Sequence, residues 1–161
     1  MNNISIEIYH KKFQKQVILL ISEIQRSEFG IDITPEQQPD LNEITHFYQK
    51  ENGNFWVAVD AGVVIGTIAL LDIGNHEGAL RKMFVRKDSR GTGVAKQLLE
   101  TLLSWAKNHQ VQAIYLGTTP AFLAAHRFYE KNGFVNIQKE VLPKTFPIME
   151  VDKKFYKKVL R

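Results

Sequence analysis

The sequence predicts a mixed α/β fold in which one mostly antiparallel sheet of about seven strands is flanked by about four helices. Two observations support this prediction. Seven short segments are rich in β-branched and aromatic residues, and four others repeat apolar residues at helical spacing. The order is strand, two helices, three strands, helix, strand, helix and two strands. Hairpins mixed with helical crossovers are typical of a single sheet covered by helices.

A strand and two helices are expected in the first part of the chain. Ile4–Tyr9 alternates as a strand does, and apolar residues from 10 to 28 recur at the spacing of a helix that stops near Gly30. Asp40-Leu41-Asn42-Glu43 resembles a capping box, with Asp in place of Ser or Thr. We therefore expect a second helix to begin at Asp40.

The middle of the chain predicts a hairpin and then a strand–loop–helix unit. Strands at 55–59 and 63–71 flank the turn residues Asp60-Ala61-Gly62. A strand over 79–85 leads into a glycine-containing loop and then a helix with an apolar face from Ala95. The remaining elements are expected to be strands at 113–118, 134–141 and 148–155 and a helix at 120–132, followed by Gly133.

Composition limits the class of protein. The 161 residues are 44% apolar and 24% charged, which predicts one globular domain over 1–161. Because there is no cysteine, a disulfide scaffold, a thiolate zinc site and a cysteine nucleophile are excluded, and we assign no metal site. No signal-peptide pattern and no apolar run of membrane-spanning length is visible, so we expect a cytoplasmic protein without a membrane partner.

The charge balance points loosely to an anionic partner. The formal net charge is +4, and either nucleic acid or a polyanionic small molecule would suit it. The basic residues are spread along the chain, and no helix-turn-helix pattern or aromatic-and-basic platform supports a nucleic-acid partner. The densest basic group is expected to be a solvated tail, and it comprises Lys153, Lys154, Lys157, Lys158 and Arg161.

The segment Arg90-Gly91-Thr92-Gly93-Val94-Ala95, here called the Arg90–Ala95 loop, lies between a predicted strand and a predicted helix. A helix start presents unpaired backbone N–H groups and a partial positive charge, and glycines let that backbone approach a ligand. The loop is therefore a candidate phosphate site, although two glycines also occur in plain strand-to-helix turns. A Walker loop would need Lys-Ser/Thr after Gly93, and a Rossmann fingerprint would need glycine at Lys96, so both are excluded.

Two segments resemble the GNAT family of N-acetyltransferases. Arg90, Gly93 and Ala95 occupy the three defining places of the pattern Arg/Gln-x-x-Gly-x-Gly/Ala. The segment Ala125-His126-Arg127-Phe128-Tyr129-Glu130-Lys131-Asn132-Gly133-Phe134 is similar to the family's Ala-x-x-Phe-Tyr-x-x-x-Gly-Phe stretch. Since the order and separation of the two segments also match, the resemblance implies the acyl-CoA N-acyltransferase fold of that family, with acetyl-CoA as cosubstrate.

The resemblance also implies roles for individual residues. Backbone N–H groups of the loop would hold the cofactor pyrophosphate, and the end of the preceding strand would pair with the pantetheine arm as an added strand. A backbone N–H there could also polarise the thioester carbonyl. The implied cofactor-binding residues are Met83, Phe84, Val85, Arg90, Gly91, Thr92, Gly93, Val94, Ala95, Lys96, Thr118, Thr119 and Ala125.

The resemblance makes Tyr129 the general acid that protonates the departing thiolate. A phenol has a pKa near ~10 and a thiol near ~8.5, so such a transfer is plausible when the two groups touch. The alternative is a core aromatic. An acceptor amine must lose a proton, and Glu77 is the best carboxylate candidate for that base, with His76 beside it. His126, one turn before Tyr129, is expected on the helix surface.

One position departs from the family pattern, and the acceptor stays open. Where many members have an asparagine that contacts the pantetheine arm, this chain has Phe122, and Thr118 or Thr119 could supply the hydrogen bond instead. The acceptor could be a small-molecule or peptide amine. Residues that could line its site are Glu28, Phe29 and Trp56.

The leading hypothesis is therefore an acetyl-CoA-dependent N-acetyltransferase that works by direct attack of the amine. A non-catalytic acyl-CoA-binding module or sensor is the main alternative. An exposed strand edge could also pair with a second copy, which would give a homodimer.

Overall fold

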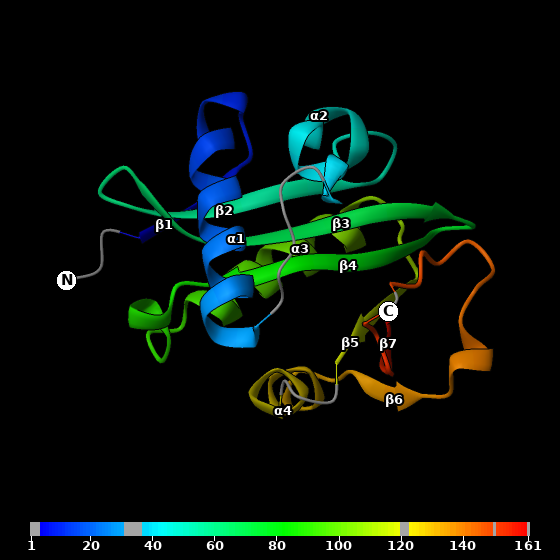
Figure 1. Cartoon of the computed structure of the whole chain (residues 1–161). Coiled ribbons are helices and arrows are strands. Elements are labelled where there is room, and N and C mark those ends of the chain that lie inside the picture. Colours follow the sequence, from blue (N-terminus) through cyan, green and yellow to red (C-terminus); the bar gives the residue numbers. More distant parts are fainter. Residues whose placement is uncertain (1–3, 31–36, 120–122, 150, 161) are drawn as a thin grey trace.

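The computed structural model describes residues 4–30, 37–119, 123–149 and 151–160, which form one seven-stranded sheet with four α-helices (Figure 1). The strands are β1 (Ile4–Ile8), β2 (Asn54–Asp60), β3 (Val63–Gly74), β4 (Glu77–Val85), β5 (Ala113–Thr118), β6 (Val135–Ile137) and β7 (Lys154–Val159). The helices are α1 (Gln14–Phe29), α2 (Ile44–Phe47), α3 (Val94–Asn108) and α4 (Leu123–Lys131).

The sheet has the spatial order β1-β2-β3-β4-β5-β7-β6. Of the pairings between these strands, β4 with β5 is parallel and the rest are antiparallel. The predicted fold class is thereby confirmed. β1 and β6 are the edge strands, and whether either edge pairs with a second copy stays a prediction. The assignment of 1–161 to a single domain also stays a prediction.

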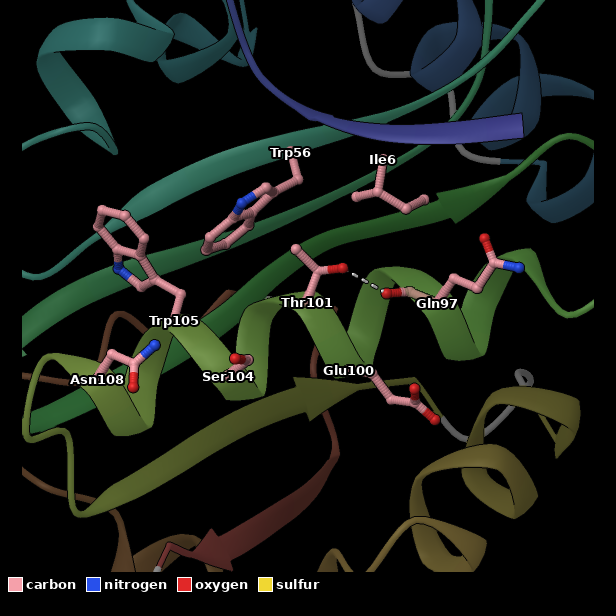
Figure 2. A pocket seen from close by; sticks show the side chains of 8 residues that line it. All are labelled: Ile6, Trp56, Gln97, Glu100, Thr101, Ser104, Trp105 and Asn108. Atoms are coloured by element: carbon pink, nitrogen blue, oxygen red, sulfur yellow. Dashed lines mark hydrogen bonds between the residues drawn. The ribbon is translucent and has the colours of Figure 1, made fainter. Parts of the chain in front are cut away.

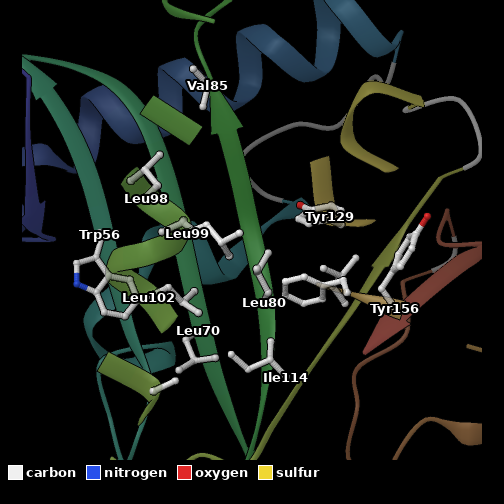
Figure 3. Packing of buried hydrophobic residues seen from close by; sticks show 14 of the residues in the cluster. Trp56, Leu70, Leu80, Val85, Leu98, Leu99, Leu102, Ile114, Tyr129 and Tyr156 are labelled. Carbon is white, nitrogen blue, oxygen red and sulfur yellow. The ribbon is translucent and has the colours of Figure 1, made fainter. Parts of the chain in front are cut away.

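Helices α1 and α3 cover opposite faces of the sheet (Figure 1). Strand β2 shows why both faces are apolar, because successive side chains in a strand point to opposite sides. Phe55 and Val57 pack with the α1 residues Val17 and Ile21, whereas Trp56 packs on the other face. There it joins the α3 leucines and Tyr129 in one cluster (Figure 3). Each fully buried large aliphatic or aromatic side chain contributes roughly 1.5–3 kcal/mol relative to exposure.

The predicted helix start at Asp40 is wrong. Pro39–Asn42 forms a 3₁₀ turn and α2 covers only Ile44–Phe47, with no side-chain cap. The Asp40 carboxylate instead accepts a hydrogen bond from the Tyr48 hydroxyl at 2.6 Å and lies 3.3 Å from the Lys82 ammonium. The Asp40 side chain is therefore used in a buried ion pair and not in a helix cap.

The C-terminal elements also differ from prediction. The strand expected at 134–141 is limited to β6, and the strand expected at 148–155 lies later, as β7. The basic group expected to be a solvated tail is therefore largely a central strand, and Arg161 lies outside the described residues. Two of its lysines cover tyrosine rings: Lys154 lies 5.7 Å from the Tyr156 ring centroid and Lys157 lies 5.3 Å from that of Tyr115. Such contacts stabilise a charged residue on a partly buried strand.

Candidate active site

Strands β4 and β5 separate after a short parallel contact, and a cavity of about 670 Å³ opens beside them. Their pairing covers Glu77–Ala79 against Ala113–Tyr115. Beyond that contact, the cavity is lined by residues 80–85 of β4, by residues 116–118 of β5 and by Thr119 directly after it. The open side of β4 therefore presents backbone groups that β5 does not use, and an extended ligand could pair with them.

A bulge in β4 lies on the wall of this cavity. Thr67 pairs with Phe84 and Ala69 pairs with Arg81, so β4 has one residue more than β3 over this stretch. Lys82, inside the bulge, has a φ of 54°, and its carbonyl accepts a hydrogen bond from the Thr67 hydroxyl at 2.7 Å. Arg81, at the start of the bulge, and Lys82, inside it, both line the cavity.

The Arg90–Ala95 loop closes one end of the cavity. Gly91 and Gly93 have φ values of 79° and 88°, in the left-handed region that favours glycine. Gly93 is the N-cap of α3, and its carbonyl accepts from the Gln97 N–H at 3.0 Å. The backbone N–H groups of Val94 to Lys96 precede that first helical bond. The helix start therefore offers free donors and a partial positive charge to an anion.

Arg90 shapes this loop through two contacts. Its Nε donates to the Val85 carbonyl at 3.0 Å, and its guanidinium forms an ion pair with Glu28 of α1. Thr92 donates through its hydroxyl to the Ser89 carbonyl. The loop is thus held to the end of β4 and to α1 before any ligand arrives. Glu28, a candidate for lining the acceptor site, is used in this ion pair.

Tyr129 projects from α4 toward the cavity with its hydroxyl oxygen pointing toward β4 (Figure 3). The residue is 6% exposed, and its ring packs edge-on against Phe128 and Phe134. Burial raises the pKa of the phenol above its ordinary value of 10.0. Within the described residues the hydroxyl has no hydrogen-bond partner. A buried phenol that keeps its proton and has no protein acceptor is free to donate to a ligand.

The structure brings most of the predicted cofactor residues around one cavity. Its lining includes Met83, Phe84, Val85, Arg90, Gly91, Ala95, Thr118, Thr119, Ala125 and Tyr129. Thr92, Gly93 and Lys96 lie in the loop and helix start without lining it. Val94 is 1% exposed and its side chain packs in the core, so only its backbone is available to contact a ligand. The Thr119 hydroxyl is buried with no hydrogen-bond partner in the described part of the chain, which suits a polar ligand contact.

Several other candidates lie elsewhere. Glu77 accepts a hydrogen bond from the Tyr115 hydroxyl at 3.1 Å, where β4 and β5 are still paired, and it does not line the cavity. Its role as a base stays a prediction that its position does not support. His76, in the turn before β4, is also outside the lining. Trp56 is a core residue, and the Phe29 side chain and Phe122 lie outside the described residues.

His126 is 6% exposed rather than on the surface, so that prediction is wrong. Its ring Nε2 lies 2.7 Å from the Thr119 carbonyl oxygen. The contact ties α4 to the end of β5, which explains why the ring turns inward. Periodicity alone cannot indicate such a contact, because the acceptor is a backbone atom.

Three charged cavity residues give no signal in the sequence pattern: Arg81, Lys82 and Asp152. Lys82 is paired with Asp40 and donates to the Gln38 side chain at 2.8 Å. Burial lowers the pKa of Lys82, and the charge of Asp40 opposes that shift. Arg81 lies 5.9 Å from the Phe47 ring centroid, and no described carboxylate lies within 4.0 Å of it. The cavity therefore has one guanidinium without an ion-pair partner in the described chain.

A second, open depression of about 590 Å³ lies along α3 on the other side of the sheet from α1 (Figure 2). Its lining comprises Ile6, Trp56, Gln97, Glu100, Thr101, Ser104, Trp105 and Asn108. Glu100 is the ionisable residue of this set, and the Thr101 hydroxyl is used in a 2.8 Å bond to the Gln97 carbonyl. Without a second ionisable group, this surface has no pair for acid–base work.

No described helix has the length and apolarity needed to cross a membrane. Within the same residues, no cluster of three or more His, Cys, Asp or Glu side chains could hold a metal ion.

Comparison with known proteins agrees with the geometry. The model of the acetyltransferase (GNAT) family matches residues 18–134. A GNAT-family acetyltransferase of Staphylococcus aureus Mu50 is 38% identical, covers 98% of this chain and 99% of its own, and superposes with a TM-score of 0.95. The PaiA N-acetyltransferase of Thermoplasma acidophilum, solved with coenzyme A, has a TM-score of 0.75 at 16% identity over 98% and 99% of the two chains. At that identity the likeness shows the fold alone.

Among curated proteins, the N-acetylaspartate synthetase of Xenopus tropicalis is 40% identical over 102 residues. The match covers 61% of this chain and 37% of that protein. The human N-acetylaspartate synthetase is 39% identical over 97 residues, which are 59% of this chain and 32% of that protein. The match thus spans about a third of the length of these two relatives.

Proposed function

Because this chain belongs to the GNAT family of acetyltransferases, we propose that it transfers the acetyl group of acetyl-CoA to a primary amine. One observation carries the proposal: the helix-start loop, the open side of β4 and the hydroxyl of Tyr129 meet around a single cavity of about 670 Å³. Such a cavity can hold a phosphate-bearing thioester and a reacting acceptor together.

In this proposal the cofactor is bound by three parts of the cavity wall: the start of α3, the open side of β4 and Thr119. The free N–H groups at the start of α3 hold the pyrophosphate, and the loop glycines let the backbone come close to it. The pantetheine arm lies along Met83 to Val85, where β4 has no β5 partner, and pairs with its backbone as an added strand. On the other wall, the buried hydroxyl of Thr119 has no described partner and supplies a further polar contact to the arm.

Acetyl transfer exchanges a C–S bond for a C–N bond and moves one proton from nitrogen to sulfur. The neutral amine attacks the thioester carbonyl carbon, the C–N bond forms, and the C–S bond then breaks with its electrons moving to sulfur. The nitrogen loses one proton to become the amide, and the thiolate gains one, so that CoA leaves as the thiol. Tyr129 donates a hydrogen bond to that sulfur as negative charge develops. Since burial raises the pKa of Tyr129 above that of a thiol, the phenol acts first as a donor to the developing charge.

The experiment that tests the proposal is thiol release from acetyl-CoA with a panel of amines, with products identified by mass spectrometry. Release of CoA together with an acetylated amine supports the enzyme. Tight cofactor binding without release from any amine would favour the non-catalytic acyl-CoA-binding module instead.

Gly93→Ala should weaken CoA binding about five- to thirtyfold. A Cβ at a φ of 88° costs roughly 1–2 kcal/mol, and that strain is borne by the N-cap of the phosphate-binding helix. Gly62→Ala is the matched control, because Gly62 has a φ of 82° in the β2–β3 turn and both glycines have open space at the Cβ position. Isothermal titration should show a weaker Kd for Gly93→Ala alone. Equal Kd values for the two variants would remove the loop from cofactor binding.

The acceptor of this enzyme carries a carboxylate as well as its amine. The half-buried Arg81 guanidinium supports this proposal, since it lines the cavity without a described ion-pair partner. A guanidinium binds a carboxylate through two parallel hydrogen bonds. The relatives named N-acetylaspartate synthetase agree with an amino acid as acceptor.

Arg81→Gln should raise KM for an amino-acid acceptor by about 10- to 150-fold, which corresponds to about 1.5–3 kcal/mol for a charge-assisted hydrogen bond. The amide of the same amino acid, which lacks the carboxylate, should be used equally well by both proteins. Arg81→Lys should recover part of the loss. Steady-state kinetics with each pair of acceptors measures the effect, and an equal loss with the amide would contradict carboxylate recognition.

A further inference from the structure

Asp152 lies on the cavity wall opposite β4, in the segment that connects β6 to β7. The backbone holds it there on both sides. The Asp152 N–H donates to the Met149 carbonyl at 3.0 Å, and the next N–H, of Lys153, donates to the Thr118 carbonyl at 3.0 Å. The carboxylate is thus placed at the end of β5, beside the residues proposed to contact the pantetheine arm.

Gly117 of β5 makes room for this carboxylate. A Cβ atom on Gly117 would lie 2.6 Å from Oδ2 of Asp152, closer than any side chain can approach. Its φ does not require glycine, so the close contact is the physical reason for a residue without a side chain. The carboxylate therefore rests directly on the backbone of a cavity-lining strand.

No described Lys, Arg or His nitrogen lies within 4.0 Å of the Asp152 carboxylate. Burial raises the pKa of Asp152 above its ordinary value of 3.8, while the Met149 backbone and the Arg81 charge oppose that shift. Burial therefore makes this carboxylate a stronger base than an exposed one.

The surrounding charges are few. Arg81 faces the carboxylate from β4, and Lys82 beside it is neutralised by Asp40. Helix α4 contributes the titratable groups His126 and Tyr129, and the ring of His126 is bonded to a carbonyl. The cavity-lining residues of β5 carry no charge. The charged residues that follow Asp152 in the chain are Lys153 and Lys154, and Lys154 covers the Tyr156 ring.

We propose that Asp152 is the general base of the transfer, accepting the proton of the acceptor ammonium in the cavity. The inference rests on the proposed function and adds the group that makes the amine nucleophilic. The proton moves from the ammonium nitrogen to a carboxylate oxygen, and the freed lone pair attacks the thioester carbonyl. The proton leaves to water once the product has gone. Asp152 takes the role predicted for Glu77, which does not line the cavity.

The test is Asp152→Asn, which keeps the shape of the side chain and its contact with Gly117. At neutral pH, kcat/KM should fall by about 10²–10⁴-fold, with the Kd for CoA unchanged. The ratio of wild-type to variant rates should then shrink as pH rises toward the pKa of the amine, because bulk solvent deprotonates the acceptor. Weakly basic amines, already neutral at pH 7, should show the smallest loss. Asp152→Glu should restore part of the activity.

Asp60→Asn, at the end of β2 and outside the cavity lining, is the matched control and should behave as wild type. A loss for Asp152→Asn that is the same at every pH and for every amine would mean a structural role and overturn the inference. Wild-type rates for Asp152→Asn, or the pH-dependent loss in Glu77→Gln instead, would also overturn it. If the wild-type protein itself acetylates no amine, the proposed function fails rather than this inference.

Discussion

Tyr129→Phe is expected to lower kcat by about 10²–10⁴-fold and to leave the Kd for CoA unchanged. The variant removes one hydroxyl that has no hydrogen-bond partner among the described residues, so no described hydrogen bond is lost with it. The ring still packs against Phe128 and Phe134. Pre-steady-state and steady-state thiol release would measure the chemical step, and isothermal titration would measure cofactor binding.

Tyr156→Phe is the matched control for this experiment. Tyr156 is buried in the same cluster, 6.2 Å from Tyr129 between ring centroids, and its hydroxyl donates to Glu130 at 2.6 Å. It does not line the cavity, so its loss should lower stability and spare kcat. Because burial raises the pKa of Tyr129, wild-type kcat should also show no loss from tyrosine ionisation up to pH ~10. A kcat for Tyr129→Phe equal to wild type would remove this phenol from the mechanism.

Asp40→Ala is expected to lower the free energy of unfolding by about 3–5 kcal/mol, because it leaves a buried ammonium without its counter-ion. The side chains of Lys82 and Asp40 are 8% and 9% exposed and lie 3.3 Å apart. The change also removes the acceptor of the buried Tyr48 hydroxyl. Without Asp40, burial should lower the pKa of Lys82 further, since desolvation is already its main cause. Chemical denaturation at neutral pH would measure the loss.

Asp88→Ala is the appropriate comparison. Asp88 pairs with Arg86 at 2.6 Å, but the two side chains are 72% and 42% exposed. Exposed pairs contribute about 0–1 kcal/mol, so this variant should unfold nearly as wild type does. Similar losses in the free energy of unfolding for Asp40→Ala and Asp88→Ala would show that burial does not determine how much the Asp40–Lys82 pair stabilises the protein.

The residues predicted to bind the cofactor lie in short segments, and most of them line one cavity. Gly93 and Ala95 begin one helix, and Tyr129 lies in a second short segment, so local patterns carry the information. The succession of strands and helices along the chain could also be predicted from local patterns, whereas the spatial order of the strands, with β7 between β5 and β6, could not. The main errors fall where tertiary contacts override local preference: Asp40 serves an ion pair instead of a cap, and His126 turns inward to a carbonyl.

The charged residues on the cavity wall could not be predicted for a related reason. Arg81 and Lys82 line the cavity where β4 bulges, and nothing in the alternation of that strand marks the bulge. Asp152 reaches the cavity only because β7 inserts between β5 and β6, far from β4 in sequence. The sequence favours Glu77 because it lies just before the predicted strand at 79–85, but in the fold it lies where β4 and β5 are still paired.

The insertion of β7 between β5 and β6 also affects which part of the cavity wall can change in length without altering the sheet. Residues 138–153 connect β6 to β7. Because Val135–Ile137 pairs with Phe155–Lys157, the two ends of this connecting loop lie side by side. Doubling the length of such a loop adds only about 0.6 kcal/mol of closure entropy. This loop contributes Phe146, Met149 and Asp152 to the cavity wall, and the family match ends before it, at residue 134. This part of the wall can therefore be lengthened, shortened or exchanged as a unit while β4 and β5 keep their register.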